Sequence, residues 1–311
     1  METLNVRPLL KWVGGKRQLL PHLRRFYPAA FNRYVEPFLG SGAVFFDLYR
    51  TGRLRDRDVV LIDSNPDLIG CYEAVRDDPD AIVRALDRLA AAHARGGQAH
   101  YYDVRDARFN PLREARRTSD GRIAYTPELA AMLIYLNRTG FNGLFRVNAS
   151  GAFNVPAGRY ERPRIVDRAR LLQVSQAFSN PRVRLEYASF ETVDEIAEPG
   201  DFIYVDPPYA PVSRTANFTG YTSSPFDTSQ QRRLQLLVLS LARRGSYVLL
   251  SNSTAGEIVG LYDRNQQARR AGLRAHRVAS RRAVNSKASR RGAVDEYLIT
   301  NVEPLHEAAL R

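Results

Sequence analysis

The sequence has few of the residues that build disulfides or metal centres. Its 311 residues include one cysteine, Cys71, which excludes an internal disulfide, and five histidines without metal-ligand spacing. No apolar run approaches the roughly 20 residues that span a bilayer, and the first residues lack a basic segment leading into an apolar one. We therefore expect a cytoplasmic protein with no metal and no membrane partner.

Lysine and acidic residues are scarce relative to arginine. The chain has 46 Lys and Arg against 33 Asp and Glu, a net charge of +13, and such a surplus is typical of proteins that bind a polyanion. A basic protein without such a partner would look the same. Only three of these cations are lysines, and Lys11 and Lys16 lie in one hexapeptide, Lys-Trp-Val-Gly-Gly-Lys. This pairing indicates a site that needs a compact ammonium group rather than a guanidinium.

The positive charge is concentrated near the carboxyl end. Residues 264–291 contain ten Arg or Lys and no Asp or Glu. Such a stretch can neutralise nucleic-acid phosphates, although a solvated loop would have the same composition.

Length and pattern predict an α/β protein. Apolar residues make up 44% and charged residues 25%, as in ordinary globular chains. Residues 34–38, 40–42 and 43–49 indicate a strand, a glycine turn and a helix, and a second strand, 59–62, ends at Asp63. Asp63 follows Gly40 by about the spacing that places a carboxylate on a ribose.

A helical section interrupts this pattern between residues 77 and 178. Within it, Thr126 should cap a helix that begins at Pro127, and residues 139–160 read as a displayed loop or hairpin, hereafter the recognition hairpin. Further strands are expected at 202–205, 247–250 and 297–299. Between the first two, a polar loop over 210–224 precedes a helix that Thr228 should cap, with Gln231 in the capping-box position.

The most informative tetrapeptide is Asp206-Pro207-Pro208-Tyr209, directly after a buried strand. Ligands of open α/β sheets bind at this edge, and two prolines make the turn rigid. Tyr209 can stack on a planar substrate while Asp206 and the Pro207 carbonyl accept the two hydrogens of its amino group. That arrangement favours attack by a conjugated, weakly nucleophilic amine on a methyl group.

The motifs together resemble the Dam-type, alpha-group DNA adenine-N6 methyltransferases over residues 8 to about 300. In family order they are 11–16, 35–42, 140–146, 153–156, 158–160, 206–211 and 216–219. The resemblance implies S-adenosylmethionine as methyl donor, S-adenosylhomocysteine as product, and an adenine flipped out of duplex DNA. It also implies a Rossmann-like α/β sheet over 1–70 and 180–311, with an inserted helical target-recognition domain, 71–179, that carries the hairpin.

The resemblance also assigns residues to the two ligands. The implied cofactor residues are Trp12, Lys16, Glu36, Phe38, Gly40, Gly42, Asp63 and Asp206. The implied DNA residues are Lys11, Phe141, Asn142, Leu144, Arg146, Pro156, Arg159, Arg214 and Asn217. Most match members that read GATC, but many members have Tyr where this chain has Phe141, so one hydroxyl is missing.

Three alternatives remain open at this point. A related amino-accepting turn serves cytosine-N4 and RNA methylation, and a decayed relative would bind DNA without activity. We expect a monomer with nucleoid-associated activity; a phage origin and a cognate restriction enzyme in the same system are left open.

Overall fold

The computed structural model describes residues 6–210, 226–281 and 293–304. The predicted polar loop after Ala210, with Arg214 and Asn217, lies outside these residues, as does the part of the basic stretch from 282 to 291.

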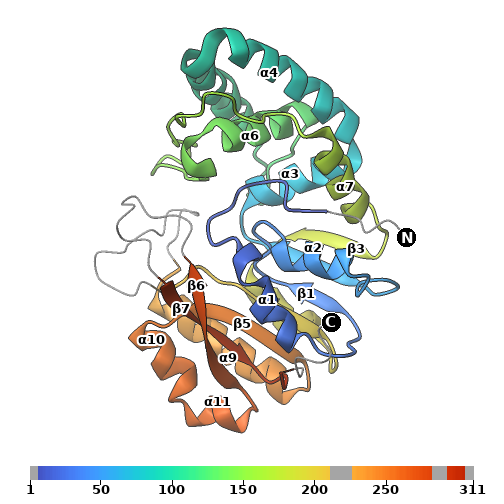
Figure 1. Ribbon diagram of the computed structural model, residues 1–311, viewed down its shortest axis with the longest axis vertical. Coiled ribbons are helices and arrows are strands. Elements are labelled where there is room, and N and C mark those ends of the chain that lie inside the picture. The colour runs from blue at the N-terminus through green and yellow to red at the C-terminus, as the bar shows by residue number, and fades with distance from the viewer. Residues whose placement is uncertain (1–5, 211–225, 282–292, 305–311) are drawn as a thin grey trace.

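A seven-stranded sheet forms the base of the molecule (Figure 1). Its strands are β1 (Tyr34–Glu36), β2 (Val59–Asp63), β3 (Val183–Tyr187), β4 (Phe202–Val205), β5 (Tyr247–Ser253), β6 (Arg274–Arg281) and β7 (Ala293–Thr300). Their spatial order is β3-β2-β1-β4-β5-β7-β6; the first five are parallel, and β7 is antiparallel to both of its neighbours. The predicted α/β fold class is confirmed.

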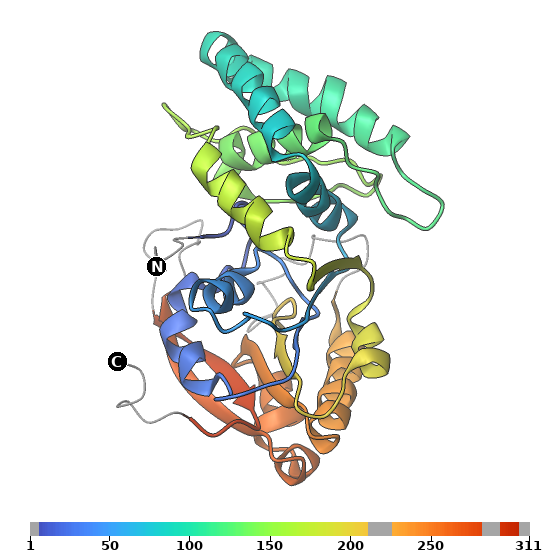
Figure 2. The same ribbon diagram turned by 90° about the vertical axis from the view of Figure 1, so that its right-hand side faces the viewer.

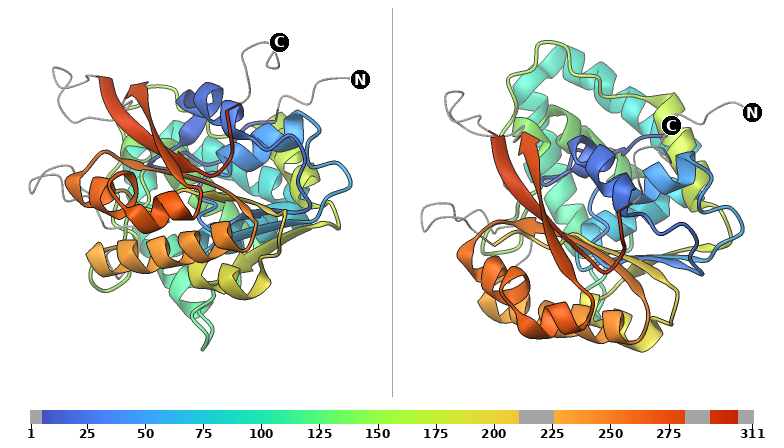
Figure 3. Two further views of the ribbon diagram at one scale, coloured as in Figure 1. Left: turned by 90° about the horizontal axis from the view of Figure 1, so that it is seen from below. Right: turned by 60° about the horizontal axis from the view of Figure 1, so that its bottom comes forward.

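The central strands are apolar on both faces because helices cover both (Figure 3). On β2, Val59 and Leu61 belong to one core cluster, and Val60 and Ile62 to the other. The first cluster packs under α1 (Leu20–Leu23), η2 (Arg24–Phe26), α2 (Ala43–Arg50), α3 (Pro66–Asp77) and α7 (Arg168–Phe178), and η1 (Lys16–Gln18) lies beside α1 and α2. The second packs under η5 (Phe190–Thr192), α8 (Val193–Ile196), α9 (Thr228–Arg243), α10 (Gly256–Ile258), η6 (Val259–Asp263) and α11 (Gln266–Arg270).

A helical section stands above the sheet (Figures 1 and 2). It contains α4 (Pro79–Tyr102), the π-helical η3 (Asp103–Phe109), α5 (Asn110–Ala115), α6 (Pro127–Thr139) and η4 (Phe141–Gly143). Thr126 caps α6 as predicted, since its hydroxyl accepts a hydrogen bond from Leu129 N at 3.3 Å. Beyond α6, antiparallel bridges join Gly140 to Ala157 and Val147 to Phe153, within the recognition hairpin.

Two local predictions, both about the start of α9, were wrong. The N-cap of α9 is Asp227, not Thr228, because the Asp227 carboxylate accepts from the backbone of Ser229 and Gln230. Gln231 forms no capping box there, because its buried amide donates to the Pro208 carbonyl at 3.0 Å. In the basic stretch, residues 266–270 form a helix and residues 274–281 a strand, which disfavours the alternative of a solvated loop for most of its described part.

Among the residues that the structure describes, no helix is both long and apolar enough to cross a membrane.

Candidate active site

The predicted catalytic turn lies at the carboxyl ends of β1 and β4, where the strand order reverses. This switch point is the usual ligand site of open α/β sheets. The Asp206 side chain is 18% exposed there. Its Oδ1 accepts a hydrogen bond from Ser251 Oγ at 2.9 Å and lies 2.8 Å from Lys16 Nζ. The carboxylate is therefore held on one oxygen by a strand neighbour and a cation.

Lys16 reaches this turn from the amino-terminal segment, and its side chain is buried, at 6% exposure. Its ammonium donates to Gly14 O at 2.6 Å and lies 4.6 Å from the centroid of the Tyr209 ring. A nitrogen donor thus sits over an aromatic face and beside a carboxylate, a favourable place for a cation. The sequence predicted Lys16 at the cofactor, and the structure places it at the catalytic turn.

Tyr209 is fixed at both of its ends. Its hydroxyl donates to Glu296 Oε2 on β7 at 2.7 Å, and the preceding Pro208 carbonyl accepts the Gln231 amide. The two contacts fix the position of the hydroxyl and of the backbone that precedes the ring.

Three acids at or near the turn have a raised side-chain pKa. Burial raises the pKa of Glu36 well above its ordinary range, although Tyr34 OH donates to Glu36 Oε2 at 2.8 Å. Burial likewise raises the pKa of Asp206, against the lowering effects of Lys16 and Ser251. Burial raises the pKa of Asp63 to about 6, while hydrogen bonds from backbone N–H groups oppose it.

The glycine turn after β1 forms the predicted cofactor wall with Asp63. Gly40 N donates to Asp63 Oδ2 and Asn65 N to Asp63 Oδ1, each at 2.9 Å. Gly40 has φ +49°, and a Cβ there would come within 3.1 Å of Trp12 Cδ1. Glycine at position 40 therefore lets the backbone pass close to the indole while its N–H binds the Asp63 carboxylate.

Gly42 and Phe38 are at this turn for packing reasons that the structure makes clear. Gly42 precedes α2 at φ +69°, where a Cβ would meet the Phe46 ring at 3.1 Å. Phe38 stacks on Phe190 with ring centroids 5.3 Å apart and meets Phe226 edge-on. Their cofactor roles stay predictions.

Lys11 joins the recognition hairpin to the amino-terminal segment. Asn137 Oδ1 accepts from Lys11 N at 2.8 Å, and its amide donates to the Lys11 carbonyl at 2.8 Å and the Gly143 carbonyl at 2.9 Å. The Lys11 ammonium lies 4.8 Å from the centroid of the exposed Tyr160 ring. A Cβ at Gly143 would come within 2.4 Å of Lys11 Cδ, so this close crossing needs glycine.

The other predicted DNA residues that the structure describes lie together on the hairpin. Arg146 is exposed, and its Nε donates to Asn154 Oδ1 across the hairpin at 2.7 Å. Phe141 is 45% exposed, although most phenylalanines of the described chain are buried. Asn142, Pro156 and Arg159 are also exposed, and Leu144 is half-buried. An exposed set of basic, amide and aromatic side chains suits contact with DNA.

Sequence reasoning missed three residues that hold the site: Ser251, Glu296 and Gln231. Each contacts the catalytic turn from a strand or helix 23 or more positions away in the chain. A buried strand that ends in polar Ser251, Asn252 and Ser253 was the available signal.

Comparison with known proteins gives a consistent result. A family model described as D12 class N6 adenine-specific DNA methyltransferase matches residues 12–280. The chain is 37% identical to the Type II methyltransferase M1.LlaDCHI of Lactococcus lactis subsp. cremoris, over 96% of each chain. It is 35% identical to the DNA adenine methylase of Escherichia coli, over 94% of each. It is 34% identical to the DNA N-6-adenine-methyltransferase of Escherichia phage P1, over 94% of this chain and 35% of the phage protein.

Proposed function

Because this chain belongs to the D12 class of N6 adenine-specific DNA methyltransferases, we propose that it methylates a flipped adenine, within GATC, using S-adenosylmethionine. Membership favours adenine over cytosine and DNA over RNA as the substrate. The retained Asp206, Pro207 and Tyr209 argue against a decayed relative.

One observation carries this proposal: the placement of the Lys16 ammonium. It is a nitrogen donor 2.8 Å from Asp206 Oδ1 and 4.6 Å from the Tyr209 ring centroid. An adenine amino group stacked on Tyr209 needs the same two partners. We infer that Lys16 marks the place of the substrate amine and withdraws when the base enters.

The chain's own groups then act on the amine. Asp206 and the Pro207 carbonyl accept hydrogen bonds from the two N–H groups of the adenine amine, which raises electron density on its nitrogen. Tyr209 holds the adenine ring by stacking. Asp206 must be ionised to accept strongly, and the hydrogen bond from Ser251, which remains after Lys16 withdraws, favours the ionised form.

The residues around Gly40 fit the proposed cofactor. Asp63 supplies a carboxylate for ribose hydroxyls, and the side-chain-free Gly40 lets backbone approach beside the Trp12 indole. When bound, S-adenosylmethionine supplies an electrophilic methyl group. Lys16, once withdrawn from Asp206, would supply a cation for an anionic group on that cofactor, such as its carboxylate.

Methyl transfer from labelled cofactor to defined duplexes tests the reaction and the site together. We expect label in N6-methyladenine on a GATC duplex and little on duplexes with one altered base pair. A folded Asp206→Ala protein should lose at least about 10² in rate, because it lacks the amine acceptor. Labelled cytosine, or near-normal turnover by Asp206→Ala, would contradict the proposal.

The exposed Arg146 is the proposed reader of a guanine. A guanidinium can donate in parallel to guanine O6 and N7, a contact worth about 1 to 3 kcal/mol of discrimination at one pair. Arg146→Ala should therefore relax the requirement at one guanine-bearing pair, with a smaller loss on the correct site. A uniform loss across all altered duplexes would instead identify a phosphate contact.

We also propose that the enzyme acts as a monomer. The Lactococcus relative is named a Type II methyltransferase, which supports a second proposal, a partner nuclease with the same recognition sequence. Plasmid DNA methylated by this enzyme should resist such a nuclease.

A further inference from the structure

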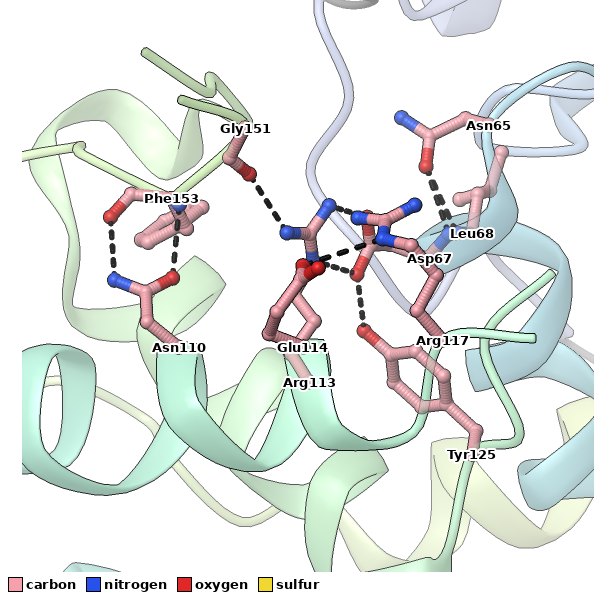
Figure 4. A network of polar contacts seen from close by, with 10 residues as sticks. All are labelled: Asn65, Asp67, Leu68, Asn110, Arg113, Glu114, Arg117, Tyr125, Gly151 and Phe153. Carbon is pink, nitrogen blue, oxygen red and sulfur yellow. Dashed lines mark hydrogen bonds and ion pairs between the residues drawn. The ribbon is translucent and has the colours of Figure 1, made fainter. Parts of the chain in front are cut away.

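We propose that Arg113 is a positioning residue for sequence recognition, which links the loop after β2 to the tip of the recognition hairpin. The inference rests on the proposed function, in which the hairpin reads base pairs. Arg113 lies on α5 and is absent from every motif of the sequence, but its guanidinium bridges two parts of the chain that serve different ligands (Figure 4).

The first contact of Arg113 is a buried ion pair with Asp67. Arg113 Nε and Nη2 donate to the two carboxylate oxygens at 2.6 and 2.7 Å, and the side chains are only 6% and 1% exposed. Tyr125 OH donates to the same carboxylate at 2.8 Å. The geometry is that of a two-pronged guanidinium–carboxylate contact, which fixes orientation as well as distance.

Asp67 is itself tied to the cofactor wall. Its backbone N–H donates to Asn65 Oδ1 at 3.0 Å at the start of α3, and Asn65 N donates to Asp63 Oδ1. The other oxygen of Asp63 accepts from Gly40 N. Four consecutive contacts thus run from the glycine turn to the Arg113 guanidinium.

On its other side, Arg113 holds the hairpin. Arg113 Nη1 donates to Gly151 O at 2.7 Å, at the hairpin tip. One turn of α5 earlier, Asn110 binds both the N–H and the C=O of Phe153, at 2.8 and 3.0 Å (Figure 4). The next residue, Asn154, is the one that holds the Arg146 side chain. The position of the proposed base reader therefore depends on the segment that α5 clamps.

The consequence of this pair is geometric more than energetic. A buried ion pair adds little stability over packed apolar residues of the same volume, because removing two charges from water offsets their attraction. A planar guanidinium with three engaged nitrogens, however, fixes Gly151 relative to Asp67. A lysine keeps the charge but not this planar fork.

Arg113→Lys tests the inference, and Arg33→Lys is the matched control. Arg33 Nε and Nη2 both donate to Oδ2 of the buried Asp201, and Nη2 also donates to a backbone carbonyl, Ile196 O, but this cluster lies at the opposite ends of β1 and β4. The readout is the ratio of kcat/KM on GATC to kcat/KM on a duplex altered at the pair that Arg146 reads. We expect this ratio to fall about five-fold or more in Arg113→Lys, as for loss of part of a guanine contact, and to stay at its wild-type value in Arg33→Lys.

A second variant tests the inference in case Arg113→Lys does not fold. Asp67→Asn combined with Arg113→Gln keeps polar partners while removing both charges, so that no buried charge is left alone. Trp12, the single tryptophan, contacts the Gly40 turn and stacks on Phe145 of the hairpin, with ring centroids 5.5 Å apart. Its fluorescence can therefore report cofactor binding. If Arg113 couples the two segments, the wild-type protein should bind S-adenosylmethionine more tightly when the GATC duplex is present, and we expect this effect of the duplex to be lost in the double variant.

The possible outcomes distinguish failure of the positioning role of Arg113 from failure of the proposed function. If Arg146→Ala relaxes recognition while both Arg113 variants keep the wild-type ratio and cofactor response, Arg113 is only structural and the inference is overturned. If the wild-type enzyme itself shows no preference at the Arg146 pair, the proposed function fails, and the inference fails with it.

Discussion

Ser251→Ala removes one hydroxyl beneath the catalytic carboxylate. Ser251 is fully buried, and its Oγ donates to Asp206 Oδ1 at 2.9 Å. When the substrate amine displaces Lys16, Ser251 becomes the remaining described donor to that oxygen. A hydrogen bond to a charged group contributes about 1.5 to 3 kcal/mol. If all of it acts in the transition state, the single-turnover rate should fall about 10- to 150-fold.

The same variant makes a prediction about pH. The Ser251 hydrogen bond lowers the pKa of Asp206, against the raising effect of burial. Its loss should raise that pKa further, so that more of the carboxyl is protonated and unable to accept the amine. The rising limb of the rate profile should therefore move to higher pH, with part of the activity recovered there.

Single-turnover methylation of a GATC duplex across pH is the assay, and Ser246→Ala is the control. Ser246 is also buried and directly precedes β5, the strand that carries Ser251. Its hydroxyl donates to the neutral backbone carbonyl of Glu198 at 3.0 Å. Ser246→Ala should lower stability by about 1 kcal/mol and leave the pH profile in place. An unchanged profile for Ser251→Ala, whatever its rate, would refute the argument for Asp206.

Two further predictions concern Tyr209 and Asp63. Tyr209→Ala should weaken capture of the base far more than Tyr209→Phe, because stacking needs only the ring; equal damage to kcat/KM would show that the hydroxyl bond to Glu296 is required instead. Because burial raises the pKa of Asp63 to about 6, and only the carboxylate accepts ribose hydroxyls, affinity for S-adenosylmethionine should increase as pH rises through that value. Titrations followed by Trp12 fluorescence should show this increase in the wild type and a flat profile in Asp63→Asn.

The parts of the fold that the sequence predicted are those with a strong local pattern. The apolar run Phe202–Val205 is β4 with the expected bounds, because a strand buried on both faces needs no alternation. β3 was missed because edge residues Arg184 and Glu186 break its apolar run. The Thr228 cap failed because Asp227, one position earlier, competes for the same N–H groups.

The site divides in the same way. Residues within short motifs, such as Lys16 and Asp206, could be placed from the sequence, and the structure joins them at 2.8 Å. Ser251, Glu296 and Arg113 could not, because each acts on a partner 45 or more positions away, and only the fold brings them together.

The strand order has a consequence for folding kinetics. β2 and β3 are hydrogen-bonded neighbours, yet α3 and the whole helical section separate them in the chain. Pairing β2 with β3 closes a long loop, and the entropy lost in closing it opposes the pairing until strand contacts have formed. The helices of the helical section, in contrast, form from contacts between residues close in sequence. The helical section should therefore collapse first and bring α7 beside α3, which delivers β3 to the sheet edge. Nascent chains released before residue 187 would lack that edge strand and expose β2 to pairing with other chains.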